Sequence, residues 1–114
     1  MNRTYQDYLN DINDSIEKIN QFVGDMDYDT FVRDGKTTYA VIRALEIIGE
    51  ATKKLPDDFK AKHNKLPWTE MSGMRNKLIH EYFGVDVRVV WKTITEDIPA
   101  IAPIIKEISK QFHL

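Results

Sequence analysis

The sequence predicts an all-α fold, a bundle of four long helices with one or two short ones. Apolar residues recur at spacings of three and four along most of the chain, as they do on the buried face of an amphipathic helix. No segment alternates convincingly with the period of two that is typical of a half-buried strand. The 114 residues fit one domain, predicted to span residues 1–114.

The composition is that of a globular protein with an ordinary hydrophobic core. The chain is 42% hydrophobic and 30% charged, and it contains no cysteine. Disulfides, thiolate metal sites and cysteine nucleophiles are therefore excluded. The first 15 residues are polar and acidic, unlike a signal peptide, and no apolar run approaches the length of a membrane span. We expect a cytoplasmic protein without a membrane segment.

The formal net charge of −2 is unevenly distributed along the chain. Residues 1–30 hold 2 basic and 7 acidic side chains, a net of −5, whereas residues 31–83 hold 10 basic and 7 acidic, a net of +3. Phosphate binding depends on local positive charge, so the overall sign does not exclude RNA as a ligand. It argues against a protein that coats nucleic acid broadly.

A first helix is predicted over about residues 4–23. Gly24 follows it, at a place where glycine commonly ends a helix. Its apolar residues share one face, and these are Tyr5, Tyr8, Leu9, Ile12, Ile16, Ile19 and Val23.

The long part of a second helix is predicted to begin near Thr37, after a first turn capped by Asp29 or Thr30 and a break at Gly35. Gly49 lies mid-helix, where glycine costs about 1 kcal/mol relative to alanine. Either another helix approaches closely there or the glycine is a tolerated defect. The apolar face is formed by Val41, Leu45, Ile48 and Leu55, and the opposite, polar face by Arg43, Glu46, Glu50 and Lys54.

The rest of the chain predicts three further helices. Residues 56–67 are polar and predict a short helix and a loop. Pro67 suits the first turn of a third helix that runs to Tyr82 or Phe83, with Gly84 as a left-handed cap. Asp86 can cap a fourth helix. A fifth is predicted from Pro99 to about Phe112, with a late start or a bend at Pro103.

Arg75 is the unusual residue of the third helix. Projected at about 100° per residue, the apolar side chains of this helix centre close to Arg75. A guanidinium does not deprotonate in proteins, so it must be paired or bound to an anion. Two interpretations remain open: a structural role, as an ion pair with a glutamate of the second helix or a stem that reaches water, and an anion-binding site.

His80 lies one turn after Asn76, at the spacing where side chains of one helix meet. An asparagine there could hold the orientation of the imidazole. A single helix histidine is more often packed or solvated than catalytic, and we interpret His63 and His113 in that way.

Arginine and histidine together suffice for RNA cleavage without a metal. Arginine can bind a phosphate and stabilise the extra negative charge of a phosphorane. Histidine can move a proton at the ribose 2′-OH or at the leaving 5′-oxygen. Because one histidine cannot easily act as base and acid together, and because Arg75 and His80 would lie about 140° apart on a helix, a site shared by two chains is favoured.

No metal or cofactor site is predicted. His80 and Glu81 are adjacent, so they would point apart, and no HExxH motif or glycine-rich phosphate loop is present.

The string RNKLIHEY, residues 75–82, has the form Arg-x4-His-x-Tyr. It resembles the signature of HEPN domains, and specifically that of the HepT toxins of HepT/MntA toxin–antitoxin pairs. Residues 41–55, VIRALEIIGEATKKL, resemble the second helix of that family, and LPWTEMSGMRNKLIHEYFGVD followed by VWKTITEDIP resembles its signature region. The resemblance covers about residues 5–110.

This resemblance implies a dimeric helical bundle that acts as a metal-independent endoribonuclease toxin. It implies that Arg75 and His80 are the catalytic pair, that Asn76 assists them, and that both chains of a homodimer line one cleft. The implied partner is an MntA-like minimal nucleotidyltransferase antitoxin, which would silence the toxin by transferring AMP to Tyr82.

Two other functions fit the same residues. The chain could be a non-catalytic subunit that binds a nucleotide or substrate for a minimal nucleotidyltransferase, with Arg75 holding a phosphate. It could also be a helical adaptor in which Arg75 makes only a structural ion pair.

Overall fold

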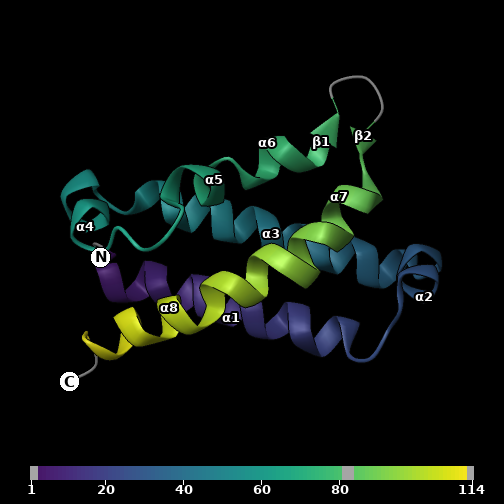
Figure 1. Ribbon diagram of the computed structural model, residues 1–114, viewed down its shortest axis with the longest axis horizontal. Coiled ribbons are helices and arrows are strands. Elements are labelled where there is room, and N and C mark those ends of the chain that lie inside the picture. The colour runs from purple at the N-terminus through teal and green to yellow at the C-terminus, as the bar shows by residue number, and fades with distance from the viewer. Residues whose placement is uncertain (1–2, 81–83, 113–114) are drawn as a thin grey trace.

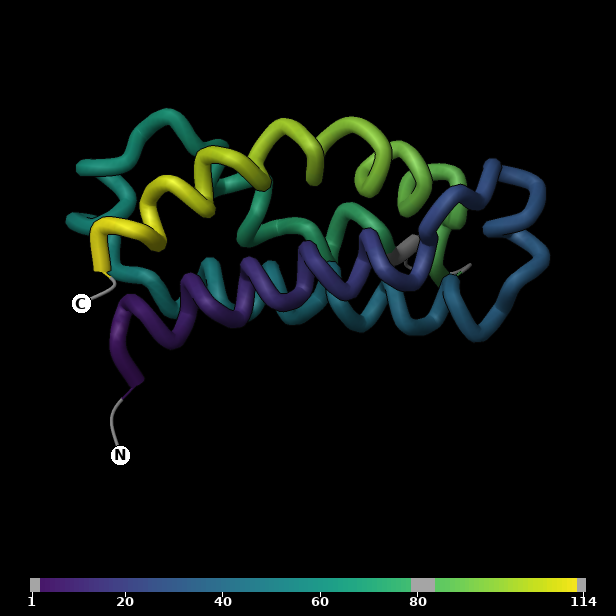
Figure 2. The backbone as a smooth tube through the Cα atoms, turned by 90° about the horizontal axis from the view of Figure 1, so that it is seen from below, coloured from purple at the N-terminus to yellow at the C-terminus, as the bar shows by residue number. Residues whose placement is uncertain are grey.

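The computed structural model describes residues 3–80 and 84–112, apart from the side chains of Ile79 and His80. Its frame is an antiparallel pair of long helices, α1 (Tyr5–Val23) and α3 (Gly35–Lys54), joined through the short helix α2 (Tyr28–Arg33) (Figure 1). A third long run packs along this pair and ends in α8 (Ile98–Lys110) (Figure 2). The all-α prediction is confirmed.

The remaining elements connect α3 to the last helical run. They are, in order, α4 (Asp57–Lys62), α5 (Trp68–Ser72), α6 (Met74–Leu78), β1 (Ile79–His80), β2 (Gly84–Val85), α7 (Val87–Lys92) and the π-helical segment η1 (Thr93–Asp97). The two strands are only two residues long and pair antiparallel, Ile79 with Val85 and His80 with Gly84. The short helix predicted within residues 56–67 is α4.

The first helix begins and ends where the sequence predicts. The Thr4 side chain accepts a hydrogen bond from the Asp7 backbone N–H, and the Asp7 carboxylate accepts one from the Thr4 N–H, forming a capping box. Gly24 follows the last turn with a φ of 52°, which favours glycine.

The second predicted helix is two helices, and its predicted cap is wrong. Asp27, rather than Asp29 or Thr30, caps α2 by accepting from the Thr30 N–H. Asp34 caps α3 by accepting from the Thr37 N–H, so the break lies one residue before Gly35. Both carboxylates stand three residues before the N–H that they accept from, which is the usual capping geometry.

The third helix is shorter than predicted. It is interrupted at Gly73 and ends at Leu78, rather than running from Pro67 to Tyr82 or Phe83. The Leu78 carbonyl accepts a hydrogen bond from the Asp86 N–H at 3.1 Å, so a partner distant in sequence takes the place of the next helical N–H. Gly84 has the predicted left-handed φ, 74°, but it belongs to β2 and does not cap a helix.

The fourth and fifth predicted helices form one run over residues 87–110. Asp86 caps it as predicted, because its carboxylate accepts from the Arg88 N–H. The fifth predicted helix is α8, which has Pro99 in its first turn as predicted but continues without a break from the π-helical segment η1. A π turn shifts the hydrogen-bond register, which helps a helix to accommodate a residue without an N–H. The described chain therefore has three long helical runs rather than four.

The core lies where α1, α3 and α8 meet. The predicted apolar face of α3 is buried, with Val41, Leu45 and Ile48 at 0% exposure and Leu55 at 2%. It packs with fully buried side chains of the other elements, among them Leu9, Ile12, Ile19, Phe31, Met71, Leu78, Ile98 and Ile105.

Candidate functional site

Arg75 lies on the surface, which the helical projection did not predict. Its side chain is 56% exposed. The projection treated residues 67–83 as one helix, whereas α6 has only five residues and buries Met74 and Leu78. These two are four residues apart and so form the inward side of α6, and Arg75 lies beside them.

Arg75 forms an ion pair with Glu46 of α3. The guanidinium Nε lies 3.4 Å from the Glu46 Oε2, and the Glu46 side chain is only 25% exposed. The glutamate of the second predicted helix that could pair with Arg75 is therefore Glu46. Within the described part of the chain, the two terminal nitrogens of Arg75, Nη1 and Nη2, have no hydrogen-bond partner. They are available to an external anion.

The helix containing Glu46 also lets α5 and α6 come close. A Cβ built on Gly49 would lie 3.5 Å from the carbonyl oxygens of Met71 and Ser72 and 3.9 Å from the Arg75 backbone N. Another helix does approach Gly49 closely, but these are ordinary contact distances, so an alanine would also fit and the approach alone does not require glycine. Gly49 stands one turn after Glu46, so the same approach brings Arg75 within reach of the carboxylate.

Asn76 and Lys77 are exposed neighbours of Arg75 on α6. Lys77 Nζ donates a 3.0 Å hydrogen bond to the Asp97 carboxylate of η1. The Asn76 side chain makes no hydrogen bond within residues 3–80 and 84–112. Two residues that the sequence singles out, Arg75 and Asn76, are thus adjacent and accessible on one short helix.

His80 follows the end of α6 by two residues. Its backbone pairs with Gly84, and its side chain lies outside the described part of the structure, as does the whole of Tyr82. Because the helix ends at Leu78, the separation of about 140° calculated for Arg75 and His80 on a continuous helix no longer applies. The spacing argument that placed Asn76 beside His80 also loses its basis.

Asp86 holds a fixed negative charge at the base of the β1–β2 pair. Hydrogen bonds from the side chain and then the backbone N–H of Arg88 hold the pKa of the Asp86 carboxyl below its ordinary value of 3.8. The carboxylate therefore stays ionised near neutral pH and keeps the start of α7 capped. This anchors the segment that returns from the site to the core.

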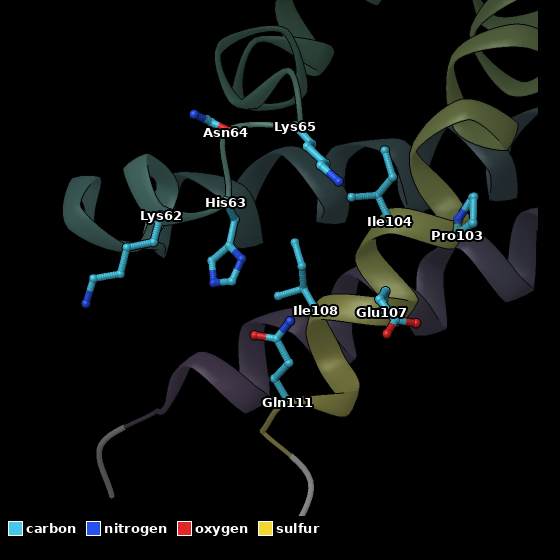
Figure 3. A pocket seen from close by; sticks show the side chains of 9 residues that line it. All are labelled: Lys62, His63, Asn64, Lys65, Pro103, Ile104, Glu107, Ile108 and Gln111. Atoms are coloured by element: carbon cyan, nitrogen blue, oxygen red, sulfur yellow. The ribbon is translucent and has the colours of Figure 1, made fainter.

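Among the cavities lined by described residues, two lie near these elements, and neither of the two is lined by Arg75 or Asn76. A cavity of about 320 Å³ lies next to the Lys77–Asp97 ion pair, between α6 and the start of α8. A larger one, about 480 Å³, lies between the loop after α4 and the last turns of α8 (Figure 3). Its lining includes Lys62 at the end of α4 and His63 and Lys65 of that loop.

His63, interpreted from the sequence as an ordinary loop residue, lines the larger cavity and also packs against Phe59, with ring centroids 4.7 Å apart. Its carbonyl accepts a hydrogen bond of 2.9 Å from the Trp68 indole N–H. These contacts are those of a residue that holds the loop in place. His113 lies outside the described residues.

The described residues form neither a metal-binding cluster nor a membrane-spanning helix. No three of their histidine, aspartate and glutamate side chains are arranged to hold a metal ion. None of their helices is long and apolar enough to cross a membrane.

The chain matches the family model described as ribonuclease HepT-like over residues 12–108. It belongs to the HepT-like ribonuclease family. The match spans the whole of α3 and α6, so the HepT-like region includes Glu46, Arg75, Asn76, His80 and Tyr82. The resemblance to HepT seen in the sequence is thereby confirmed.

Curated relatives cover nearly the same length. A Thermococcus cleftensis protein named probable ribonuclease HepT is 57% identical over 101 residues, which is 89% of this chain and 92% of the relative. A Caldanaerobacter subterraneus protein named as a candidate RNase is 47% identical over 93% of this chain and 95% of its own. A Methanocaldococcus jannaschii protein, also named as a candidate RNase, is 45% identical over 97% of this chain and 96% of the relative. No solved structure gives a significant match.

Sequence reasoning left two partners of this HepT-like site unidentified. The sequence indicated that Arg75 could pair with a glutamate of the second helix, but it did not indicate which one. Glu46 lies one turn from Gly49, where α3 and the end of α5 are close, and it is the glutamate that pairs with Arg75. The sequence also did not indicate the Lys77–Asp97 pair, because those residues meet only when the last helical run folds back along α6.

Proposed function

We propose that this HepT-like protein is a metal-independent endoribonuclease whose catalytic residues are Arg75 and His80, assisted by Asn76. The observation that carries the proposal is the state of Arg75: an exposed guanidinium, paired at Nε with Glu46, whose two terminal nitrogens have no hydrogen-bond partner among the described residues. It stands five residues before His80 in a chain 57% identical to a protein named probable ribonuclease HepT. RNA is the substrate because the chemistry of this pair requires a 2′-OH.

The proposed reaction is an internal transfer at phosphorus. His80 removes the proton from a ribose 2′-OH, and the 2′-oxygen attacks the adjacent phosphorus. The bond to the 5′-oxygen of the next nucleotide breaks, and a protonated histidine returns a proton to that oxygen. The products are a 2′,3′-cyclic phosphate and a 5′-hydroxyl end. Arg75 stabilises the added charge on the non-bridging oxygens, and the Asn76 amide contacts the phosphate or the imidazole.

The proposal includes a homodimer, because base and acid roles are more easily divided between two histidines than combined in one. Tyr39 supports this part. It is 81% exposed and precedes Glu46 by seven residues, which places both on the same face of α3. A large, exposed aromatic side chain beside the proposed site is typical of an interface. A two-fold axis there would bring two copies of the motif together.

The proposal extends to a toxin–antitoxin role. The partner is a MntA-like nucleotidyltransferase that transfers AMP to Tyr82, the motif tyrosine. The adenylate would add a phosphate charge two residues from His80 and compete with RNA for Arg75. Incubation with the antitoxin and ATP would add the mass of one AMP per transfer. This addition should be absent from Tyr82→Phe and present in Tyr39→Phe, and modification of Tyr82→Phe to the same extent would contradict the assignment.

The ribonuclease proposal is tested by incubating the purified protein with single-stranded RNA in EDTA. Wild type should cleave, whereas Arg75→Ala and His80→Ala should lose activity by at least about a hundredfold. Lys53→Ala is a control that removes an exposed positive charge elsewhere, on α3. Wild type that cleaves none of a varied set of RNAs would refute the enzyme. If it then still bound a nucleotide through Arg75, the non-catalytic subunit would be the correct description.

A further inference from the structure

We propose that Glu46 is a positioning residue, which orients the Arg75 guanidinium so that its two terminal nitrogens face the scissile phosphate. This inference rests on the proposed function. It concerns a residue on a different helix from the Arg-x4-His motif, 29 positions earlier in the chain.

The carboxylate is the more firmly placed member of the pair. Glu46 belongs to the 20-residue helix α3, between Leu45, which is fully buried, and Ile48, also fully buried. Arg75 belongs to the five-residue α6 and is 56% exposed, against 25% for Glu46. A long, exposed side chain on a short helix is therefore paired with a less exposed carboxylate on a long helix that contributes much of the core.

The contact engages only one edge of the guanidinium. The measured approach is between Nε and Oε2, at 3.4 Å. In a planar guanidinium paired through Nε, the outer edge between the two Nη groups is still open, and there they can donate two parallel hydrogen bonds to phosphate oxygens. Without Glu46 the same group would sample many rotamers and reach the productive one less often.

A second glutamate of α3 provides a matched comparison. Glu50 follows Glu46 by one turn and pairs with Arg43 at 3.5 Å, with both side chains 60% exposed. This pair lies within α3, and neither of its side chains makes an ion pair or hydrogen bond with a described residue of α6. Glu50→Ala therefore removes the same charge from the same helix without releasing Arg75.

The experiment combines kinetics with a measurement on the free protein. In steady-state RNA cleavage, Glu46→Ala should lower kcat by about tenfold to a hundredfold, the cost of misplacing a catalytic group by about an ångström, with KM changed by less than about twofold. Glu46→Asp should recover part of the loss, and Glu50→Ala should behave as wild type.

In an Arg75→Ala background, Glu46→Ala should have no further effect. In NMR relaxation, the Arg75 Nε–H should be more mobile in Glu46→Gln than in wild type.

The outcomes separate this inference from the ribonuclease proposal. If wild type cleaves and Arg75→Ala does not, but Glu46→Ala cleaves as fast or faster, then Glu46 shields the arginine and the inference is overturned. An equal loss in Glu50→Ala would also overturn it, because the effect would be one of general charge. If wild type does not cleave at all, the ribonuclease proposal fails. The positioning role is then tested by NMR alone, and equal mobility of the Arg75 Nε–H with and without the carboxylate would overturn it.

Discussion

Gly49 of α3 lies against the end of α5, with its Cβ position 3.5 Å from the Met71 carbonyl oxygen. This contact sets how closely α5 and α6 approach α3. Because Glu46 stands one turn before Gly49, and the Arg75 backbone N lies 3.9 Å from the same Cβ position, the spacing at the glycine also sets the reach of the Arg75–Glu46 ion pair.

Replacing Gly49 with a small and then with a large side chain tests whether the spacing between the helices controls the site. Gly49→Ala should fold and cleave RNA as wild type does, because 3.5 Å is an ordinary contact distance and alanine favours the helix by up to about 1 kcal/mol. Gly49→Leu must displace backbone, so we expect a loss of about 1–3 kcal/mol in unfolding free energy and a larger loss of kcat. Urea unfolding and RNA cleavage measure the two. Unchanged activity in Gly49→Leu would show that the helix spacing does not control the site.

Arg75→Lys should not preserve activity. Lysine keeps the charge but has no Nε edge for Glu46 and no pair of parallel donors for a phosphate. We expect kcat to fall by at least about tenfold, with the unfolding midpoint nearly unchanged because exposed ion pairs contribute about 0–1 kcal/mol. Arg43→Lys, on α3, is the matched control. Full activity in Arg75→Lys would mean that only a positive charge is needed.

Tyr39→Glu should weaken the proposed homodimer. A carboxylate on the exposed face of α3 would be desolvated on association, so the variant should shift toward monomer in sedimentation at a fixed concentration and lose RNA cleavage with it. Phe22→Glu changes another exposed aromatic side chain, 40% accessible on α1, and should remain dimeric. A wild type that sediments as a monomer while it cleaves RNA would contradict the shared site.

Asp34 should contribute a pH-dependent part of the stability. The hydrogen bond that it accepts from the Thr37 N–H holds the pKa of its carboxyl below 3.8. A lowered pKa in the folded state means that the stabilisation is present above about pH 4 and is lost as the pH falls through the folded-state pKa.

Asp34→Asn keeps the accepting oxygen but does not titrate. Its unfolding free energy should therefore be close to that of wild type at pH 7 and should fall less steeply below about pH 4, as measured by urea unfolding at several pH values. Asp29→Asn, an exposed position on α2, is the control. An identical pH dependence in Asp34→Asn and wild type would exclude the cap as a source.

The sequence predicts several elements whose ends depend on neighbouring residues, although the equally local cap of α2 by Asp27 was missed. Thr4 and Gly24 bound α1, and Asp86 starts α7, because each forms its cap with residues within four positions. The end of α6 was not predictable in this way. It depends on the hydrogen bond from the Asp86 N–H to the Leu78 carbonyl and on the pairing of β1 with β2, which no helical periodicity encodes.

The candidate site was likewise predicted in part from the sequence. The identity of Arg75 as a group that needs an anionic partner followed from its chemistry, and its partner Glu46 is present. Its place in the middle of an apolar face was predicted wrongly, because the projection continued a helix that is interrupted at Gly73 and ends at Leu78. The catalytic roles of Arg75, His80 and Asn76, and the modification of Tyr82, stay predictions.

The most direct test of the central claim is the chemistry of the product ends after RNA cleavage in EDTA. Mass spectrometry of a short, defined RNA should show a 2′,3′-cyclic phosphate on one fragment and a 5′-hydroxyl on the other, since the attacking oxygen is the ribose 2′-OH. These ends should be absent with Arg75→Ala and with His80→Ala. Fragments ending in a 3′-hydroxyl and a 5′-phosphate would require water or hydroxide as the nucleophile and would contradict the account.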